Sequence, residues 1–380
     1  MLGKILLISI SFLIINTSIA QPAKSASVNY NEGARLKDEK KYAEAITAYK
    51  KAIAIQPTYK EALYEAGWCS NELEKYQDAL SFLLKAKQQW PNESKIYFEL
   101  GYVYQQLEKT EDAKKNYNKC LSLNKEYDLA YKALGNLFFD QHDYTAALEN
   151  YKAYISYAKD DISSSDFYYN KGYTENELEK FSDAIESLNK AIEIKNEEPR
   201  SFDELGYAYY KLDDADNAIK YYNSSIALKA DSHVPYVGLG DVYKDLKKNT
   251  DEALKNYLKA IEYKPENKKS QYRIGWCYNE KEQYKEAVPY LKKAIELDKN
   301  YQSAITELGY SHYALGEYSN ALALFNKAIL LDKKDDLSFY YSGLCYVGMK
   351  DKTDALKMYD ALQALQSTYA DKLKTQIDGM

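Results

Sequence analysis

Apolar and small residues recur along this chain with the spacing of amphipathic helices. Two neighbouring stripes illustrate the pattern. The first consists of Tyr97, Leu100, Gly101 and Tyr104. The second consists of Ala113, Tyr117 and Cys120. Each stripe covers one face of an α-helix, and the polar residues 108–110 separate the two. The pattern predicts a pair of helices joined by a short turn.

The same helix pair returns at a nearly constant interval. Ten glycines mark it, at positions 33, 67, 101, 135, 172, 206, 240, 275, 309 and 343, with spacings of 34, 34, 34, 37, 34, 34, 35, 34 and 34 residues. Alanines at 45, 79, 113, 147, 184, 218, 253, 287, 321 and 355 follow the same spacings. Two small residues in every period indicate helices that cross closely. The period itself indicates an array of repeated units.

The residues within one period also match a known repeat. One copy contains Tyr236, Leu239, Gly240, Tyr243, Ala253, Tyr257, Ala260 and Pro265. This pattern resembles the tetratricopeptide repeat, a helix–turn–helix unit of about 34 residues. The resemblance implies an all-α fold, a right-handed α-solenoid (superhelix) of stacked antiparallel helix pairs. In this family the first helix of each repeat lines a concave groove.

Ten repeats are predicted, followed by a C-terminal capping helix at 367–380. The repeats span residues 26–59, 60–93, 94–127, 128–161, 165–198, 199–232, 233–267, 268–301, 302–335 and 336–369. Three departures from regular spacing are expected to matter. They are a longer loop at Asp160–Ser165, a stretched turn at 247–249, and Pro289 inside a second helix, where we expect a mild kink. In the first repeat, Asn29 and Glu32 replace an aromatic residue and a leucine, as suits an end cap.

The sequence also shows a longer period that spans three repeats. The segment GWCSNELEKYQDALSFLLKA at 67–86 returns in altered form at 172–191 and at 275–294. We hypothesise that a three-repeat block was triplicated behind a single leading repeat. Ordinary similarity between members of one repeat family is the alternative explanation.

The N-terminus has the pattern of a secretory signal peptide. Residues 1–20 carry one early charge at Lys4, an apolar stretch, and small residues before Gln21. Cleavage after Ala20 would leave a short linker at 21–25 and no membrane span, and would export the protein to the periplasm, the outer envelope or the medium. An uncleaved anchor is the alternative. Three of the four cysteines, Cys69, Cys277 and Cys345, occupy equivalent places in different repeats, so all four are expected to be free thiols.

Composition and charge narrow the function further. The formal net charge is −6, and no basic stripe is present, which disfavours nucleic acid as a partner. The three histidines are scattered, and no cluster has metal-ligand spacing, so we expect no metal, no cofactor and no enzymatic activity. Most Glu and Lys residues are interpreted as solvated helix faces. The predicted function is therefore an exported scaffold or adaptor that binds protein or peptide segments in the groove.

Two sets of candidate contact residues follow. The groove set contains Tyr64, Trp68, Asn71, Phe98, Tyr102, Gln105, Tyr169, Tyr173, Asn176, Tyr272, Trp276, Asn279, Tyr310 and Tyr313. Aromatic rings with nearby amides suit extended peptides, although packing between neighbouring first helices would also explain the tryptophans. The second set resembles part of the carboxylate clamp of some family members and contains Lys132, Asn136, Asn170 and Arg200. Glu204 occupies a place where that clamp has a basic residue.

Two other functions stay open. One is an accessory subunit of a cell-envelope enzyme, secretion or polysaccharide system that docks one larger protein. The other is a self-associating structural protein.

Overall fold

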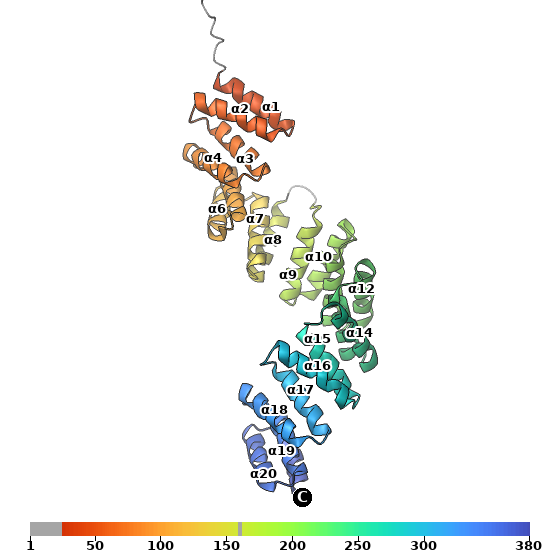
Figure 1. The fold of residues 1–380 in the computed structure, drawn as a ribbon. Coiled ribbons are helices and arrows are strands. Elements are labelled where there is room, and N and C mark those ends of the chain that lie inside the picture. The colour runs from red at the N-terminus through yellow and green to blue at the C-terminus, as the bar shows by residue number, and fades with distance from the viewer. Residues whose placement is uncertain (1–24, 159–161) are drawn as a thin grey trace, which may run out of the picture. The chain divides into compact units, whose positions relative to one another are not determined.

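The computed structural model describes residues 25–158 and 162–380, which form 21 α-helices and no strand (Figure 1). The predicted all-α class is confirmed for these residues. The predicted signal peptide and most of the predicted linker lie outside the described residues, and so does part of the predicted loop at Asp160–Ser165.

The described residues divide into two compact parts, one of residues 25–141 with 149–158 and one of residues 142–148 with 162–380. The helices of the N-terminal part are α1 (Ala26–Asp38), α2 (Tyr42–Ile55), α3 (Lys60–Glu72), α4 (Tyr76–Gln89), α5 (Ser94–Gln106), α6 (Thr110–Leu123) and α7 (Asp128–Asp140). Helix α8 (Tyr144–Tyr157) has residues in both parts.

The helices of the C-terminal part are α9 (Ser165–Glu177), α10 (Phe181–Ile194), α11 (Pro199–Lys211), α12 (Ala215–Leu228), α13 (His233–Asp245), α14 (Thr250–Tyr263), α15 (Lys268–Glu280), α16 (Tyr284–Leu297), α17 (Gln302–Ala314), α18 (Tyr318–Leu331), α19 (Asp336–Gly348), α20 (Lys352–Ala364) and α21 (Tyr369–Asp378). Within each part, consecutive helices pack against each other, and first helices of neighbouring repeats also make contact. Stacked helix pairs are therefore the building unit, as the repeat pattern predicts.

The repeat glycine marks the closest approach of the two helices in a pair. A Cβ atom on Gly101 would lie 2.6 Å from the ring of Tyr117, and one on Gly67 would lie 2.7 Å from Leu83. Repeats two, five and eight place a leucine at this contact. These leucines are Leu83, Leu188 and Leu291. In repeats one, three, four, six, seven and nine, a tyrosine or a phenylalanine lies against the repeat glycine. The three-repeat period of the sequence is thus also a period in helix packing.

A residue with left-handed backbone stands in the turn within every repeat. These residues are Lys40, Glu74, Glu108, His142, Glu179, Asp213, Lys248, Glu282, Gly316 and Lys350. The chain then closes the turn with a backbone hydrogen bond back to the helix, as from Lys75 N to Ser70 O at 2.9 Å. The turn of repeat seven has four residues between α13 and α14, where the turn of repeat one has three between α1 and α2. The stretched turn lies where the sequence predicts it.

The cysteines and the internal proline are accommodated in the helices. Cys69, Cys120, Cys277 and Cys345 are buried free thiols. Burial raises the pKa of the Cys69 thiol to about 12, so it stays protonated and unreactive near neutral pH. Helix α16 runs from Tyr284 to Leu297 with Pro289 inside it.

Helix α21 closes the C-terminal end of the array. Its residues Leu373 and Ile377 are fully buried, and Leu373 covers Gly343 of repeat ten. Leu373 thereby fills the place that the second helix fills in other repeats. In the part of the chain that the structure describes, no helix is long and apolar enough to cross a membrane.

Candidate first-helix surface

The predicted groove residues stand at three positions on the first helices: three residues before the repeat glycine, one after it and four after it. We call the residues at these positions the first-helix surface. In α3 they are Tyr64, Trp68 and Asn71. Rings and amides behave differently at these positions, since the aromatic residues are partly exposed and the asparagines are buried.

The rings that follow the repeat glycine pack on the preceding repeat. Trp68 meets Tyr42, the first residue of α2, edge to face at a centroid distance of 5.7 Å, and Lys37 lies 5.0 Å above the indole. The same pairing recurs in Tyr102 with Tyr76, Tyr207 with Phe181 and Tyr310 with Tyr284. Trp276 is likewise covered by Lys244 at 5.1 Å. Packing between repeats therefore uses part of each ring.

Exposed ring surface is greatest at Tyr102 and Tyr207, which are 37% and 38% exposed. Tyr207 is absent from the residues predicted from the sequence, although it follows the repeat glycine of repeat six directly and so occupies the place of Tyr102. That position is the signal that could have found it. The other predicted rings are half-buried. They are Tyr64, Trp68, Phe98, Tyr169, Tyr173, Tyr272, Trp276, Tyr310 and Tyr313.

The three predicted asparagines are buried and add almost no exposed area to the first-helix surface. Asn71 Nδ2 donates to Glu99 Oε2 of the next repeat at 2.8 Å, and Asn71 is 5% exposed. The same bond joins Asn176 to Glu204 at 2.8 Å and Asn279 to Glu307 at 2.9 Å. Each amide already holds two repeats together, which leaves it poorly placed to bond an extended backbone. Gln105 instead accepts a hydrogen bond from the Tyr117 hydroxyl at 2.9 Å.

The glutamates of these pairs are unusual carboxylates. Burial raises the pKa of Glu99 to about 7 and that of Glu204 to about 7, and it raises the pKa of Glu307 as well. The hydrogen bond from each asparagine favours the charged form but does not offset the loss of hydration. The interpretation of glutamates as solvated faces therefore fails for these three.

Three of the four residues of the predicted carboxylate clamp already have side-chain partners in the structure. In the N-terminal part, Asn136 Oδ1 accepts from the Tyr151 hydroxyl at 3.0 Å, and Lys132 lies 5.8 Å from the Tyr154 ring. In the C-terminal part, Arg200 pairs with Asp166 and with Glu198, and its guanidinium stacks 4.2 Å from the Tyr169 ring. Asn170 is half-buried on α9. Arg200 has its charge balanced before any ligand arrives, which weakens the resemblance to a clamp.

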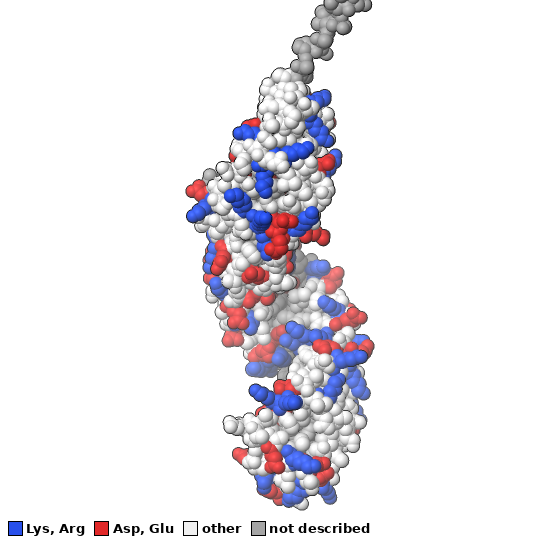
Figure 2. Space-filling model, turned by 90° about the vertical axis from the view of Figure 1, so that its left-hand side faces the viewer, with Lys and Arg blue, Asp and Glu red and all other residues white. Residues whose placement is uncertain are grey.

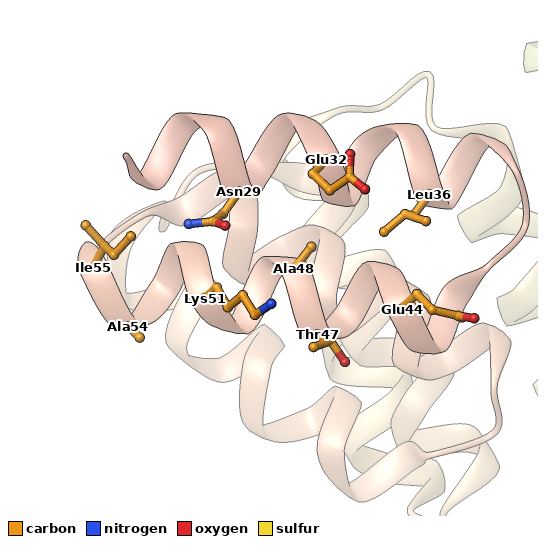
Figure 3. A pocket seen from close by; sticks show the side chains of 9 residues that line it. All are labelled: Asn29, Glu32, Leu36, Glu44, Thr47, Ala48, Lys51, Ala54 and Ile55. Carbon is orange, nitrogen blue, oxygen red and sulfur yellow. The ribbon is translucent and has the colours of Figure 1, made fainter. Parts of the chain in front are cut away.

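A hollow of about 720 Å³ lies on the α1–α2 pair (Figure 3). It is lined by Asn29, Glu32, Leu36, Glu44, Thr47, Ala48, Lys51, Ala54 and Ile55. Its walls mix polar side chains, charges of both signs, alanines and the two aliphatic residues Leu36 and Ile55, which suits the end of an array better than a selective site. The two residues that the sequence predicts as an end cap, Asn29 and Glu32, belong to it.

The face shown in Figure 2 has no large patch of a single charge, because Lys and Arg are interspersed with Asp and Glu. Within residues 25–158 and 162–380, no group of three or more His, Cys, Asp or Glu side chains is placed to hold a metal ion. The features that recur from repeat to repeat are half-buried rings and buried amide–carboxylate pairs.

Comparison with known proteins adds the family context. Models of the tetratricopeptide repeat match residues 36–97, 94–127, 172–213, 199–232, 235–267, 269–301 and 306–370. Over 164 residues the chain is 30% identical to heat shock protein STI1 of Saccharomyces cerevisiae. The aligned region covers 41% of this chain and 27% of STI1. The chain thus spans about a quarter of the length of this relative.

Two solved structures to which this chain is similar are YrrB and PilF. YrrB, described as a TPR protein with an unusual peptide-binding site, is 27% identical and covers 50% of this chain and 99% of its own, with a TM-score of 0.47. PilF of Pseudomonas aeruginosa is 18% identical and covers 56% of this chain and 97% of its own, with a TM-score of 0.50.

Proposed function

Because this chain belongs to the tetratricopeptide repeat family, we propose that it is a non-catalytic scaffold or adaptor that binds an extended segment of a partner protein on its first-helix surface. Proteins of this family generally mediate protein–protein interactions. The observation that carries the proposal here is the recurrence of partly exposed rings, Tyr102 and Tyr207 foremost, at one position of the first helices of repeats two, three, five, six, eight and nine.

Rings held in this way suit the recognition of extended segments. Each ring is fixed on one edge by the preceding repeat, as Tyr102 is by Tyr76, so little side-chain entropy is lost on binding. The exposed remainder covers apolar side chains, and the hydroxyl reaches the backbone or water. The rings occur in three pairs of neighbouring repeats, two with three, five with six and eight with nine, and this spacing fits a ligand segment that crosses two adjacent first helices.

Export is the second element of the proposal. Its support is the signal-like pattern of residues 1–20, with an apolar stretch followed by Ser18 and Ala20. The N-terminal sequence of the protein purified from its source tests it. A mature chain that begins at Gln21, recovered outside the cytoplasm, is the expected result, and an intact Met1 on a cytoplasmic protein contradicts it.

The alternative function is docking of a partner protein on the second helices, and exposed apolar side chains support it. Ile55, Leu228 and Leu330 lie on second helices and are 51%, 44% and 79% exposed. An accessory subunit of an envelope system, or a self-associating structural protein, would use such residues. We place this alternative second because exposed single apolar side chains are common on soluble proteins.

Alanine substitution separates the two faces. In a co-purification assay from the source organism, Tyr102→Ala with Tyr207→Ala is expected to lose the partner, because both rings supply exposed apolar surface. Leu84→Ala with Leu228→Ala is the matched control on second helices, where the two side chains are 38% and 44% exposed. Partner loss in the control pair alone contradicts the proposal, and circular dichroism checks that both variants are folded.

A further inference from the structure

A second hollow lies on the first-helix surface of the C-terminal part. It measures about 380 Å³ and is formed mainly by α9, α11 and α13. Its walls are Tyr173, Glu177, Asp203, Glu204, Tyr207, Tyr222, His233, Val234, Val237, Gly238, Asp241 and Asn267. We call it the acidic hollow, since four of these residues carry carboxylates and none is Lys or Arg.

Gly238 lies in the wall of this hollow. It stands two residues before the repeat glycine, where Glu99, Glu204 and Glu307 stand in other repeats. A Cβ atom on Gly238 would lie 2.2 Å from the Tyr222 ring, so the ring occupies the space of the missing side chain. Repeat seven therefore has an aromatic ring where repeats three, six and nine have a glutamate. The sequence shows Gly238 only as an additional glycine beside Gly240.

Two of the four carboxylates already have partners. Glu204 accepts from Asn176 at 2.8 Å, and Asp241 accepts from the Tyr257 hydroxyl at 2.6 Å and pairs with Arg273. The other two are Asp203 and Glu177.

The negative charge of these other two carboxylates is not balanced in the same way. Asp203 Oδ1 is buried and finds no hydrogen-bond partner among the described residues, while Glu177 is exposed at the end of α9. His233 does not compensate them, because burial and nearby Lys264 lower its pKa and favour the neutral ring. The wall of the hollow thus holds two carboxylates for which no ion pair is found among the described residues, the exposed Glu177 and the partly buried Asp203, which has the neutral Ser225 hydroxyl beside it.

The raised pKa values of two carboxylates in the wall agree with an excess of negative charge in the hollow. Burial raises the pKa of Asp203 to about 6 and that of Glu204 to about 7, so each carboxylate holds its charge at a cost. A cation in the hollow would relieve that cost through charge-assisted hydrogen bonds. The rings of Tyr173 and Tyr207 add faces of negative potential, which also attract cations.

We propose that the acidic hollow binds the side chain of a lysine or arginine from an extended partner segment lying on the first-helix surface. This inference rests on the proposed function and adds the chemistry of one partner residue. Val234 and Val237 suit the aliphatic stem of such a side chain, while Asp203 and Glu177 receive its charged end. The hollow lies beside exposed Tyr207, so one segment can contact the ring and the hollow together.

The test begins with a library of random dodecapeptides displayed on phage and selected on the full chain. Selected peptides are synthesised, and binding is measured by titration calorimetry. We expect a basic residue at one shared position, and replacing it with norleucine should weaken binding about tenfold, as loss of a charged hydrogen bond does. Asp203→Asn with Glu177→Gln should weaken binding by a similar factor. Asp203→Asn removes a buried charge that no ion pair balances, so the fold is expected to persist.

The matched control is Glu72→Gln with Glu280→Gln. These residues occupy the place of Glu177, five residues after the repeat glycine, in repeats two and eight. Unchanged binding in the control supports the assignment to the hollow. Selected peptides that bind without a shared basic residue, or that bind the Asp203 and Glu177 variant as tightly as the natural chain, overturn this inference and leave the proposed function standing. Failure to recover any binding peptide counts against both.

Discussion

At the scale of single residues, the buried pairs between asparagine and glutamate define the seams between repeats two and three, five and six, and eight and nine. Their amides lie at positions that suggest an exposed groove when the sequence is considered alone. The partner that buries each amide stands 28 residues later, in the next repeat. A position on one helix does not reveal that contact, and so the burial of Asn71 could not be predicted.

Glu99→Gln should change the pH dependence of stability. Glu99 has a folded pKa of about 7 against a usual value of 4.5, so the folded protein binds more protons between these values than the unfolded chain does. Its contribution therefore falls as pH rises from about 4.5 through about 7. In denaturant unfolding at pH 8 the Glu99→Gln variant should be more stable than the natural chain by roughly 2 kcal/mol, and at pH 4 it should show no such gain.

The control for this change is Glu126, an exposed residue in the turn before α7, whose replacement by Gln should leave stability unchanged at both pH values. A Glu99→Gln variant that loses stability at pH 8 would show that the charge itself holds the seam together.

Ala208→Ser should stabilise the seam between repeats five and six. In the equivalent seam further on, Ser311 Oγ donates to Asn279 Oδ1 at 2.8 Å, while Asn176 Oδ1 is buried with no partner among the described residues. Ala208 occupies the place of Ser311, two residues after the repeat glycine. Supplying the missing donor should raise the free energy of unfolding by about 1 kcal/mol. Urea unfolding measures it, and a loss of stability contradicts the account.

At the scale of elements, the helix pair is set by its glycine and by the side chain that lies on it. Much of this was predictable. The glycine and alanine spacings locate every helix pair, because a position without room for a Cβ atom accepts only glycine. The sequence indicates less clearly which side chain covers each glycine. In repeat ten that side chain is Leu373, which comes from α21, a helix that follows the last repeat.

Gly101→Ala should destabilise its helix pair, although alanine normally stabilises a helix by about 1 kcal/mol over glycine. The added Cβ would lie 2.6 Å from the Tyr117 ring, which is fully buried and has little room to move. Overpacking of this kind typically costs about 1–3 kcal/mol, so a net loss of roughly 1 kcal/mol is expected in thermal or urea unfolding. Gly379→Ala, which meets nothing closer than 3.6 Å, should be neutral.

Leu373→Ala should loosen the C-terminal end of the array. Leu373 is fully buried over Gly343, and its truncation leaves a cavity that costs about 2–4 kcal/mol. Because each repeat relies on its neighbours, the loss should appear as faster hydrogen exchange in α19–α21 and little change in α15. Lys372→Ala, on an exposed side chain, is the control. Uniformly faster exchange along the chain would contradict a local role for α21.

At the scale of the whole molecule, the all-α class and the family were predictable from the sequence because a period of 34 residues leaves few alternatives. The candidate site was predictable only in outline. Position along the first helix correctly places rings at the surface, yet Tyr207 was missed, and so was the acidic hollow. Its lining comes from residues of several repeats, with the Tyr222 ring lying against Gly238, and that grouping becomes visible only when these helices are placed side by side.

Site-specific photo-crosslinking in the source organism tests the central claim most directly. A photoreactive amino acid replaces Tyr102 or Tyr207 on first helices, and Leu84 or Leu228 on second helices, each in an otherwise natural chain. The account predicts a partner protein crosslinked from each of the two first-helix positions and identified by mass spectrometry, and none from the second-helix positions. Crosslinks to a partner, or to a second copy of this chain, from Leu84 and Leu228 alone would contradict it.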